Sequence, residues 1–292
     1  MDYNPTYLAL AANLCFAVGS LFYARFARRT SPAWVNAYKA LLAAGAFAAT
    51  VTLTSGWLGL QGAPLAGLLV SGAIGLGLGD VFLVTAMARM GAGRTLMIFA
   101  FQPVVLGLLA HFFLGQTLDA RQRLAVVLFM LCLATVSDEG RRREGHWNTA
   151  AFAAAGAGML LDAGGVLLTR ACFEAVPALQ AVEGNFYRTL GALAFFAAYS
   201  RFKPLGFVSR FKALGRRDRL LVTVGSLIGC YASLLFYLAA IKHGQLAAVS
   251  GVTITSTAFA SALECAVERR RPSAHLVAAF GFFAAGMAAL VG

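Results

Sequence analysis

The sequence predicts an all-α integral membrane protein with ten transmembrane helices, arranged as two inverted five-helix repeats. Of its 292 residues, 60% are hydrophobic and only 12% are charged, whereas a soluble domain carries about 25% charged residues. Apolar runs recur along the whole chain, and about 20 such residues are enough for a helix to cross a bilayer. A weak internal repeat divides these runs into two sets. The composition excludes a soluble enzyme, a disordered protein and a secreted disulfide scaffold.

Turn residues and charges separate the apolar runs, as in RRTSP at 28–32 and GLQGAP at 59–64. Because the runs are continuous rather than alternating, membrane-spanning strands are excluded. A cleaved signal peptide is not expected either, since no Lys or Arg precedes the first run. The expected spans are 6–24, 32–54, 65–88, 95–115, 121–137, 149–171, 177–199, 219–240, 246–266 and 274–291.

Small residues recur in these spans, for example in SGAIGLGLG at 71–79. In lipid, small side chains let helices approach one another closely. Gly75, Gly77 and Gly79 have the spacing of part of a dinucleotide-binding loop, but they lie inside an apolar helix and follow no strand. Packing, or a pliable helix beside a cavity, is the favoured interpretation. The five cysteines form no CxxC motif or Cys/His cluster, so the sequence predicts no metal site, disulfide framework or cofactor.

Two segments of the chain are similar at an offset of 149 residues: NAYKALLAAGAFAA at 36–49 and NFYRTLGALAFFAA at 185–198. Further matches precede them (Gly19 and Arg25 with Gly164 and Arg170) and follow them (AMARMG at 86–91 with AAIKHG at 239–244). Matches in the same order predict two halves, 1–140 and 141–292. Since each half has an odd number of helices, the second is inserted upside down. Inverted repeats are an architecture of secondary transporters.

Several motifs have the pattern of a known family: a small-residue first helix ending near Arg25, a basic residue in the second helix (Lys39) and the seventh (Arg188), and FQPVVLGLLAHFFLGQTL at 101–118. ALECAVERRRP at 262–272 is the second-half counterpart of the last motif. With these features the chain resembles the drug/metabolite transporter superfamily, of the ten-helix type with two EamA domains. It departs from the family pattern at Gln116, where a glutamate is usual, and at Thr255-Ser256, which replace a proline region.

The resemblance implies a transporter of small organic solutes, commonly amino acids, related metabolites or nucleotide-like compounds. We therefore expect a secondary transporter that moves a small organic metabolite (an amino acid, organic anion or related solute) by alternating access at a midplane cavity of the inner membrane, rather than an enzyme. A flippase for a lipid-linked substrate is the alternative within the same fold. A membrane-embedded lipid-modifying enzyme is disfavoured, because no HxxxD motif, serine elbow or paired His/Asp is present.

Ionisable side chains inside the spans are few, and each charge costs about 2.5–3.5 kcal/mol at a helix centre on insertion scales. Such groups normally face a cavity or a partner. Lys39 and Arg188 occupy the same repeat position, and an asparagine precedes each by one helical turn. Each amide and cation together suit a carboxylate or phosphate, although internal salt bridges are an equally supported reading. The expected substrate-binding residues are Lys39, Arg188, Asn36, Asn185, Tyr38, Tyr187, Gln102 and Tyr231, and the expected coupling residues or counter-ions are Asp80, Asp162 and Glu183.

The net charge of +12 is explained by orientation in the membrane rather than by nucleic-acid binding, since no recognition module is visible. Segment 200–219 interleaves basic residues with Phe and Leu, which predicts an interfacial segment that attracts anionic lipids. A small-molecule substrate and membrane lipids are thus the expected partners; the sequence contains no signal for an oligomeric state.

The distribution of basic residues predicts that both termini lie outside the cell. Connections after the odd-numbered spans contain 18 Lys and Arg, and those after the even-numbered spans contain 4. Cytoplasmic loops are the ones enriched in these residues, although the resembling family usually has cytoplasmic termini. A reporter enzyme that works only outside the cytoplasm should therefore be active when it is fused to Gly292. A fusion active only in the cytoplasm would reverse this topology.

Overall fold

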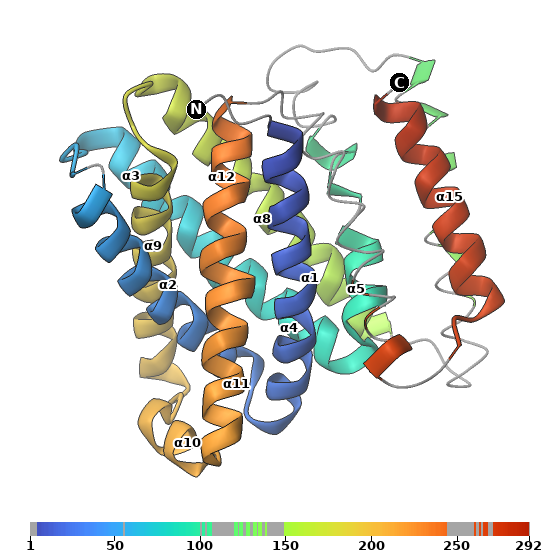
Figure 1. The fold of residues 1–292 in the computed structure, drawn as a ribbon, viewed down its shortest axis with the longest axis horizontal. Helices are drawn as coiled ribbons and strands as arrows, with labels where there is room; N and C mark the ends of the chain where they lie inside the picture. The colour runs from blue at the N-terminus through green and yellow to red at the C-terminus, as the bar shows by residue number, and fades with distance from the viewer. Residues whose placement is uncertain are drawn as a thin grey trace.

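The computed structural model describes most of the first three spans and most of the second half of the chain (Figure 1). The described residues are 5–54, 56–99, 149–243 and 271–291, with short pieces at 101–102, 104–106, 120–121, 123–124, 127–128, 131–132, 134–135, 138, 260, 263 and 265–267. Within these ranges the chain forms helices and turns, and no strand. The described part of the protein is therefore all-α, as the sequence predicts.

The described helices are of two kinds, α-helices and two π-helical segments. The π-helical segments, η1 and η2, each continue from one α-helix directly into another, so α3–η1–α4 and α11–η2–α12 are long continuous helices. The elements are α1 (Pro5–Arg29), α2 (Pro32–Thr54), α3 (Gly62–Ser71), η1 (Gly72–Gly79), α4 (Asp80–Met90), α5 (Ala92–Phe99), α8 (Thr149–Ala175), α9 (Ala181–Phe202), α10 (Phe207–Ala213), α11 (Arg216–Ser226), η2 (Leu227–Ala232), α12 (Ser233–His243) and α15 (Ala274–Val291).

Five of these helices are long and apolar enough to cross a membrane: Tyr7–Arg29, Pro32–Thr54, Gly62–Met90, Thr149–Ala175 and Arg216–His243. Helix α9 also has sufficient length, with 22 residues, but its Glu183, Asn185 and Arg188 lower its mean hydropathy. The chain is therefore a multi-pass membrane protein.

The predicted spans 6–24, 32–54, 65–88, 149–171, 177–199, 219–240 and 274–291 all fall on observed helices. Several helices extend further than predicted; α1, for example, continues to Arg29. Basic side chains at helix ends can keep their stems along apolar surface with the charge in water, so a helix does not end where its apolar run ends. Predicted span 246–266 lies mostly outside the described residues, as do about half of span 95–115, nearly half of span 121–137 and the boundary at 140; the described residues of 121–137 are helical.

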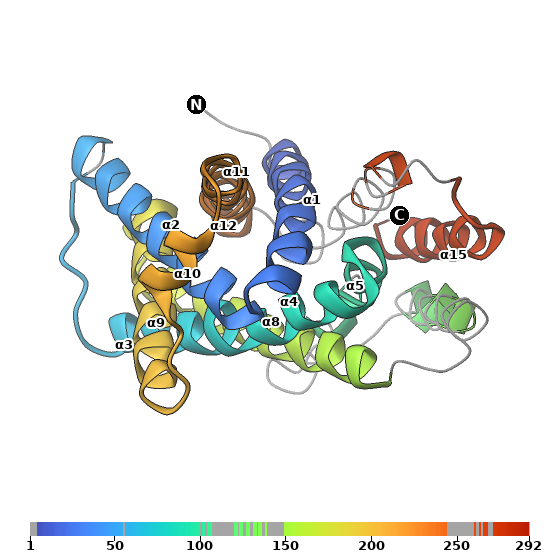
Figure 2. The same ribbon diagram turned by 90° about the horizontal axis from the view of Figure 1, so that it is seen from below.

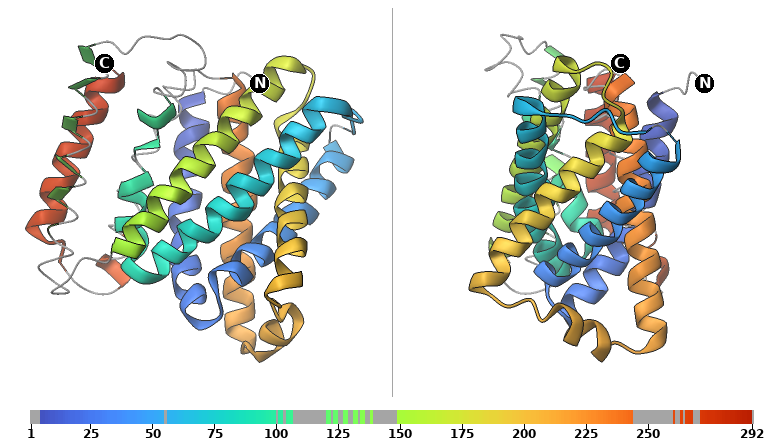
Figure 3. Two further views of the ribbon diagram at one scale, coloured as in Figure 1. Left: turned by 180° about the vertical axis from the view of Figure 1, so that it is seen from behind. Right: turned by 90° about the vertical axis from the view of Figure 1, so that its left-hand side faces the viewer.

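The helices pack in three pairs (Figures 2 and 3). Helix α1 packs along α11–η2–α12, α8 packs along α3–η1–α4, and α2 packs against α9. Helices α1 and α8 cross the bundle in opposite directions, and α1 begins at the same end of the bundle at which α15 ends (Figure 1).

Glycines allow close approach at the contacts that surround the centre of the bundle. A methyl group on Gly72 of η1 would overlap the backbone carbonyl of Arg188 on α9. Gly19 of α1 and Gly229 of η2 face each other backbone to backbone, so a side chain on either would overlap the other. Small residues thus let these helices approach one another closely, as the sequence predicts.

Candidate functional site

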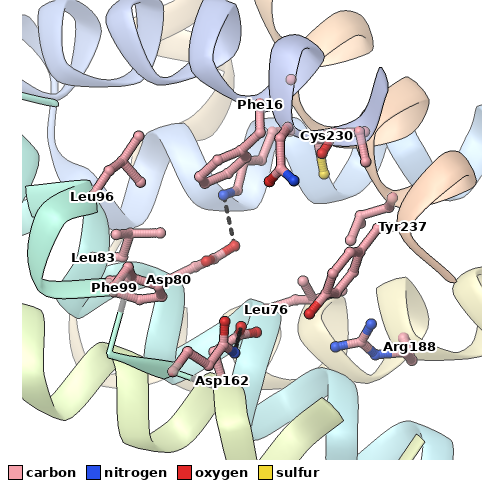
Figure 4. Close-up of a pocket in the computed structure, with 17 residues that line it drawn as sticks. Phe16, Leu76, Asp80, Leu83, Leu96, Phe99, Asp162, Arg188, Cys230 and Tyr237 are labelled. Carbon is pink, nitrogen blue, oxygen red and sulfur yellow. Dashed lines mark hydrogen bonds and ion pairs between the residues drawn. The ribbon is translucent and has the colours of Figure 1, made fainter. Parts of the chain in front are cut away.

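A cavity of about 110 Å³ lies at the centre of the bundle (Figure 4). Residues from α1, α2, η1, α4, α5, α8, α9, η2 and α12 line it. Its polar lining consists of Asn13, Lys39, Asp80, Gln102, Asp162, Arg188, Cys230, Ser233 and Tyr237, and its apolar lining includes Phe16, Leu76, Leu83, Leu96 and Phe99. Lys39 and Arg188, the two cations expected in one cavity, both line this one.

Lys39 forms an ion pair with Asp80, and both residues line the cavity. The distance from Lys39 Nζ to Asp80 Oδ2 is 2.6 Å, and the two residues are only 3% and 7% exposed. The ammonium group also lies 4.7 Å from the centre of the Tyr23 ring, a cation–π contact. Removing one member of such a buried pair leaves an uncompensated charge. The charge of Lys39 is therefore already neutralised before any ligand enters.

Arg188 is 1% exposed and makes a different set of contacts. Its Nε donates a hydrogen bond to Ser71 Oγ at 3.1 Å, and the Ser71 hydroxyl in turn donates to the Gly165 carbonyl at 2.6 Å. Its Nη1 is buried and has no hydrogen-bond partner among the described residues. An unsatisfied charged donor in a low-dielectric interior is costly, so Arg188 can donate a further hydrogen bond to an acceptor that the described residues do not supply.

Asp162 is the second carboxylate of the cavity. Gln102 Nε2 donates a hydrogen bond to Asp162 Oδ2 at 2.7 Å. The ion pairs among the described residues do not include one between Asp162 and either Lys39 or Arg188. Four charged side chains therefore surround the cavity: Lys39 and Asp80 form a direct ion pair, whereas Arg188 and Asp162 do not.

Asn36 and Asn185 lie outside the cavity lining. Asn36 Nδ2 donates to the Asp80 carbonyl at 2.8 Å, and Asn185 Nδ2 donates to the Leu234 carbonyl at 2.8 Å. Asp80 is the first residue after η1, and Leu234 is the second residue after η2. Each asparagine thus joins its helix to the point where a π-helical segment returns to α-helix. The Oδ1 atoms of both are buried without a partner in the described structure.

The tyrosines of the predicted set also bond away from the cavity. The Tyr38 hydroxyl lies 2.7 Å from Thr223 Oγ1, and the Tyr231 hydroxyl lies 2.7 Å from Thr50 Oγ1. Each of these hydrogen bonds joins α2 to the long helix α11–η2–α12. The structure therefore brings together Lys39, Arg188, Gln102, Asp80 and Asp162, and it does not bring the tyrosines to them.

Glu183 lies near the start of α9, away from the cavity lining. Its Oε2 accepts a hydrogen bond from the Leu58 backbone N–H at 3.1 Å, and its Oε1 accepts one from the Tyr187 hydroxyl at 3.2 Å. The carboxylate is thus held by the loop that precedes α3 and by its own helix. In this structure it is not the counter-ion of either cavity cation.

Sequence reasoning did not select Asn13, Ser71 or Tyr237. Asn13 and Tyr237 line the cavity, and Ser71 accepts the hydrogen bond from Arg188. The only signal for these residues is a polar side chain inside an apolar run, which is weaker than a charge. Tyrosine and serine also occur in packed membrane helices without any ligand.

Residues 5–137 match the model of the EamA-like transporter family. This match spans less than half of the chain and supports its membership of the drug/metabolite transporter superfamily. The superfamily predicted from the sequence motifs is thereby confirmed. No curated protein matches the sequence of this chain.

Twenty-eight chains of solved structures match the fold of this EamA-like chain. One, described only as "Crystal structure of protein", is 15% identical with a TM-score of 0.69. The match covers 98% of this chain and 95% of the other. At this identity the likeness shows the fold alone.

The two asparagine contacts lead to a stability prediction. Asn36→Leu and Asn185→Leu should each lower the free energy of unfolding by about 0.6 kcal/mol, the average for hydrogen bonds between membrane helices, and by no more than about 1.7 kcal/mol, the largest value. Reversible unfolding in mixed detergent micelles measures this difference. The control is Thr54→Val, because the exposed Thr54 hydroxyl bonds only within its own helix. Unchanged stability in both asparagine variants would show that these contacts do not join the helices.

Proposed function

We propose that the chain is a secondary transporter of a small organic metabolite (an amino acid, organic anion or related solute) that works by alternating access at the central cavity. The main support is a cavity between long apolar helices that is lined by four charged side chains. Ionisable side chains within transmembrane helices normally line a substrate or ion pathway. The superfamily match supports transport rather than enzymatic chemistry.

The proposed architecture is two inverted repeats, residues 1–140 and 141–292. Support comes from the opposite directions of α1 and α8, which begin the two halves (Figure 1). The proposed repeat relates α1 to α8 and the third helix of one half to the third helix of the other. Both contacts that this relation exchanges are present, because α1 packs on α12 and α8 packs on η1. Helices α2 and α9, which the repeat also relates, pack on each other. A π-helical segment interrupts the third helix of each half. In inverted-repeat transporters the substrate site lies at the interface of the halves.

Both halves contribute charges to the cavity. Lys39 and Asp80 belong to the first half, whereas Asp162 and Arg188 belong to the second. The close ion pair therefore lies within one half and can persist while the halves rock. When the halves rock, the distance between side chains of opposite halves changes. A solute that contacts both halves is therefore exposed to one side of the membrane at a time.

The π-helical segments supply the pliable elements of this proposal. Such segments are frequent at functional sites, and η1 and η2 each begin or end beside cavity residues, Asp80 and Ser233 respectively. Asn36 and Asn185 act as positioning residues, since each bonds the backbone that follows one of these segments. The tyrosines and Glu183 join helices around the cavity in the same manner.

We further propose the inner membrane as the location, with termini outside and segment 200–219 at the cytoplasmic interface. In that segment Phe207 and Phe211 pack on the ring of Tyr38, while Phe202 and Val208 are exposed. An exposed apolar side chain among basic residues suits the headgroup region of an anionic leaflet.

Transport by the purified protein tests the proposed function. A thermal-shift screen of amino acids, organic acids and nucleosides would identify solutes that stabilise the protein, since a ligand at 100 times its Kd adds about 2.7 kcal/mol. Counterflow of the best solute into liposomes should be saturable with the wild type. Arg188→Ala should abolish this uptake, and Arg188→Lys should keep the charge but lose bidentate recognition and most of the flux.

Arg201→Ala is the matched control, because Arg201 is an exposed arginine near the end of the same helix. It should transport like the wild type. No uptake of any stabilising solute by folded wild-type protein would contradict the proposal. If Arg188→Ala instead fails to fold and Asp162→Asn restores folding, Arg188 has a structural role only.

A further inference from the structure

We propose that the cavity binds a small organic monoanion with an apolar body together with one proton. The anionic group binds Arg188, the apolar body lies against Phe16, Leu83, Leu96 and Phe99, and the proton, taken from bulk water, is held on the Asp162 carboxylate. This inference rests on the proposed function, because it names the substrate class of the same cavity. It assigns different tasks to the two cations and to the two acids.

Arg188 is the cation with free capacity. Lys39 lies 2.6 Å from the Asp80 carboxylate, so an anion that approached Lys39 would have to displace a buried counter-ion. Arg188 has no counter-ion at ion-pair distance among the described residues, and its buried Nη1 has no acceptor. A guanidinium presents a planar fork that suits carboxylate, sulfonate and phosphate groups. The anionic group therefore binds Arg188 rather than Lys39.

The opposite wall of the cavity is apolar. In Figure 4, Leu83, Leu96 and Phe99 lie at the far side from Arg188, and Asp80 lies between them. Ligand pockets typically combine such apolar walls with a few polar groups that fix orientation. A solute with one charged end and one apolar end matches this division, whereas a polyanion or a sugar would leave polar groups against Leu and Phe.

The charge balance couples the anion to a proton. With Asp162 ionised, the two acids and the two cations of the cavity already cancel. An added anion would then leave one uncompensated negative charge in a low-dielectric space, which is costly. Protonation of Asp162 restores neutrality when the anion is present. Anion and proton therefore enter the cavity together, and neither is stable there alone.

Asp162 is the acid that can change protonation with the least disruption. The Asp80 carboxylate is held by Lys39, whereas Asp162 has a neutral partner, Gln102, at 2.7 Å. Gln102 can turn its amide so that the carbonyl oxygen accepts the proton of the neutral acid. The titratable or charged groups that face Asp162 from the surrounding helices are Lys39 on α2, Asp80 on α4, Arg188 on α9 and Tyr237 on α12.

Binding of benzenesulfonate and hexanesulfonate to the full-length purified protein tests this inference. Both are permanent anions over the useful pH range, so any pH dependence comes from the protein. Calorimetry in buffers of different ionisation enthalpy should show uptake of about one proton per anion. Over the pH range in which Asp162 is ionised in the free protein and protonated in the complex, affinity should fall about tenfold per pH unit, since each anion then requires one proton.

Variants separate the two tasks. Arg188→Gln should weaken binding of both anions by about 100-fold, as expected for loss of a charge-assisted bidentate contact. Asp162→Asn should bind both anions without proton uptake and without pH dependence. Glu174→Gln removes an exposed carboxylate from the same helix and should behave as the wild type. The neutral isostere benzenesulfonamide should bind at least about 100-fold more weakly than benzenesulfonate.

Three results would overturn the inference: no binding of either sulfonate at millimolar concentration, binding without proton uptake, or tighter binding of zwitterionic phenylalanine that is lost in Asp162→Asn. The last result would mean that Asp162 binds an ammonium group. These measurements need no transport, so they are separable from the proposed function. Proton-linked binding without counterflow would support this site and contradict transport, whereas counterflow of a neutral solute would do the reverse.

Discussion

Neutralisation of buried charge is the constraint on which the rest of this structure depends. Each ionisable group inside a bilayer must find a partner, a cavity or a proton. Lys39 and Asp80 meet this requirement by direct contact at 2.6 Å. Arg188 meets it only in part, through Ser71, and the remaining donor is left to the cavity. The difference between these two solutions makes the site asymmetric and is the basis for the proposed binding of an anion at Arg188.

Two similar sets of contacts arrange the backbone around the cavity. Asn36 and Asn185 bond the chain just after η1 and η2, and glycines bring η1 against α9 and η2 against α1. Close glycine contacts keep neighbouring helices in register, whereas π-helical turns are points where a helix can change its geometry. A rigid frame with two adjustable segments is what the proposed rocking of two halves about a fixed site requires. The asparagines hold these segments without occupying the cavity themselves.

The sequence was sufficient for the class of fold and for the charged residues of the cavity. Lipid demands long apolar helices, and a charge within one is conspicuous, so Lys39, Asp80, Asp162 and Arg188 could be selected from the sequence. The roles of Asn36 and Asn185 could not, because an amide beside a cation looks the same whether it faces a ligand or a backbone carbonyl. Glu183 lies within an apolar run, yet the fold brings a loop N–H to it. Tyr237 and Asn13 reach the cavity only through helix packing, which no local pattern encodes.

The most direct test of this account is a double-mutant cycle on the close ion pair, read out as the free energy of unfolding. If Lys39 and Asp80 neutralise each other, Lys39→Met and Asp80→Leu should each destabilise the protein by about 3–5 kcal/mol, because each leaves one buried charge unpaired. The double variant should recover most of that loss. Small, additive effects of the two substitutions would contradict the account, since Lys39 would then be as free as Arg188 to bind an anion.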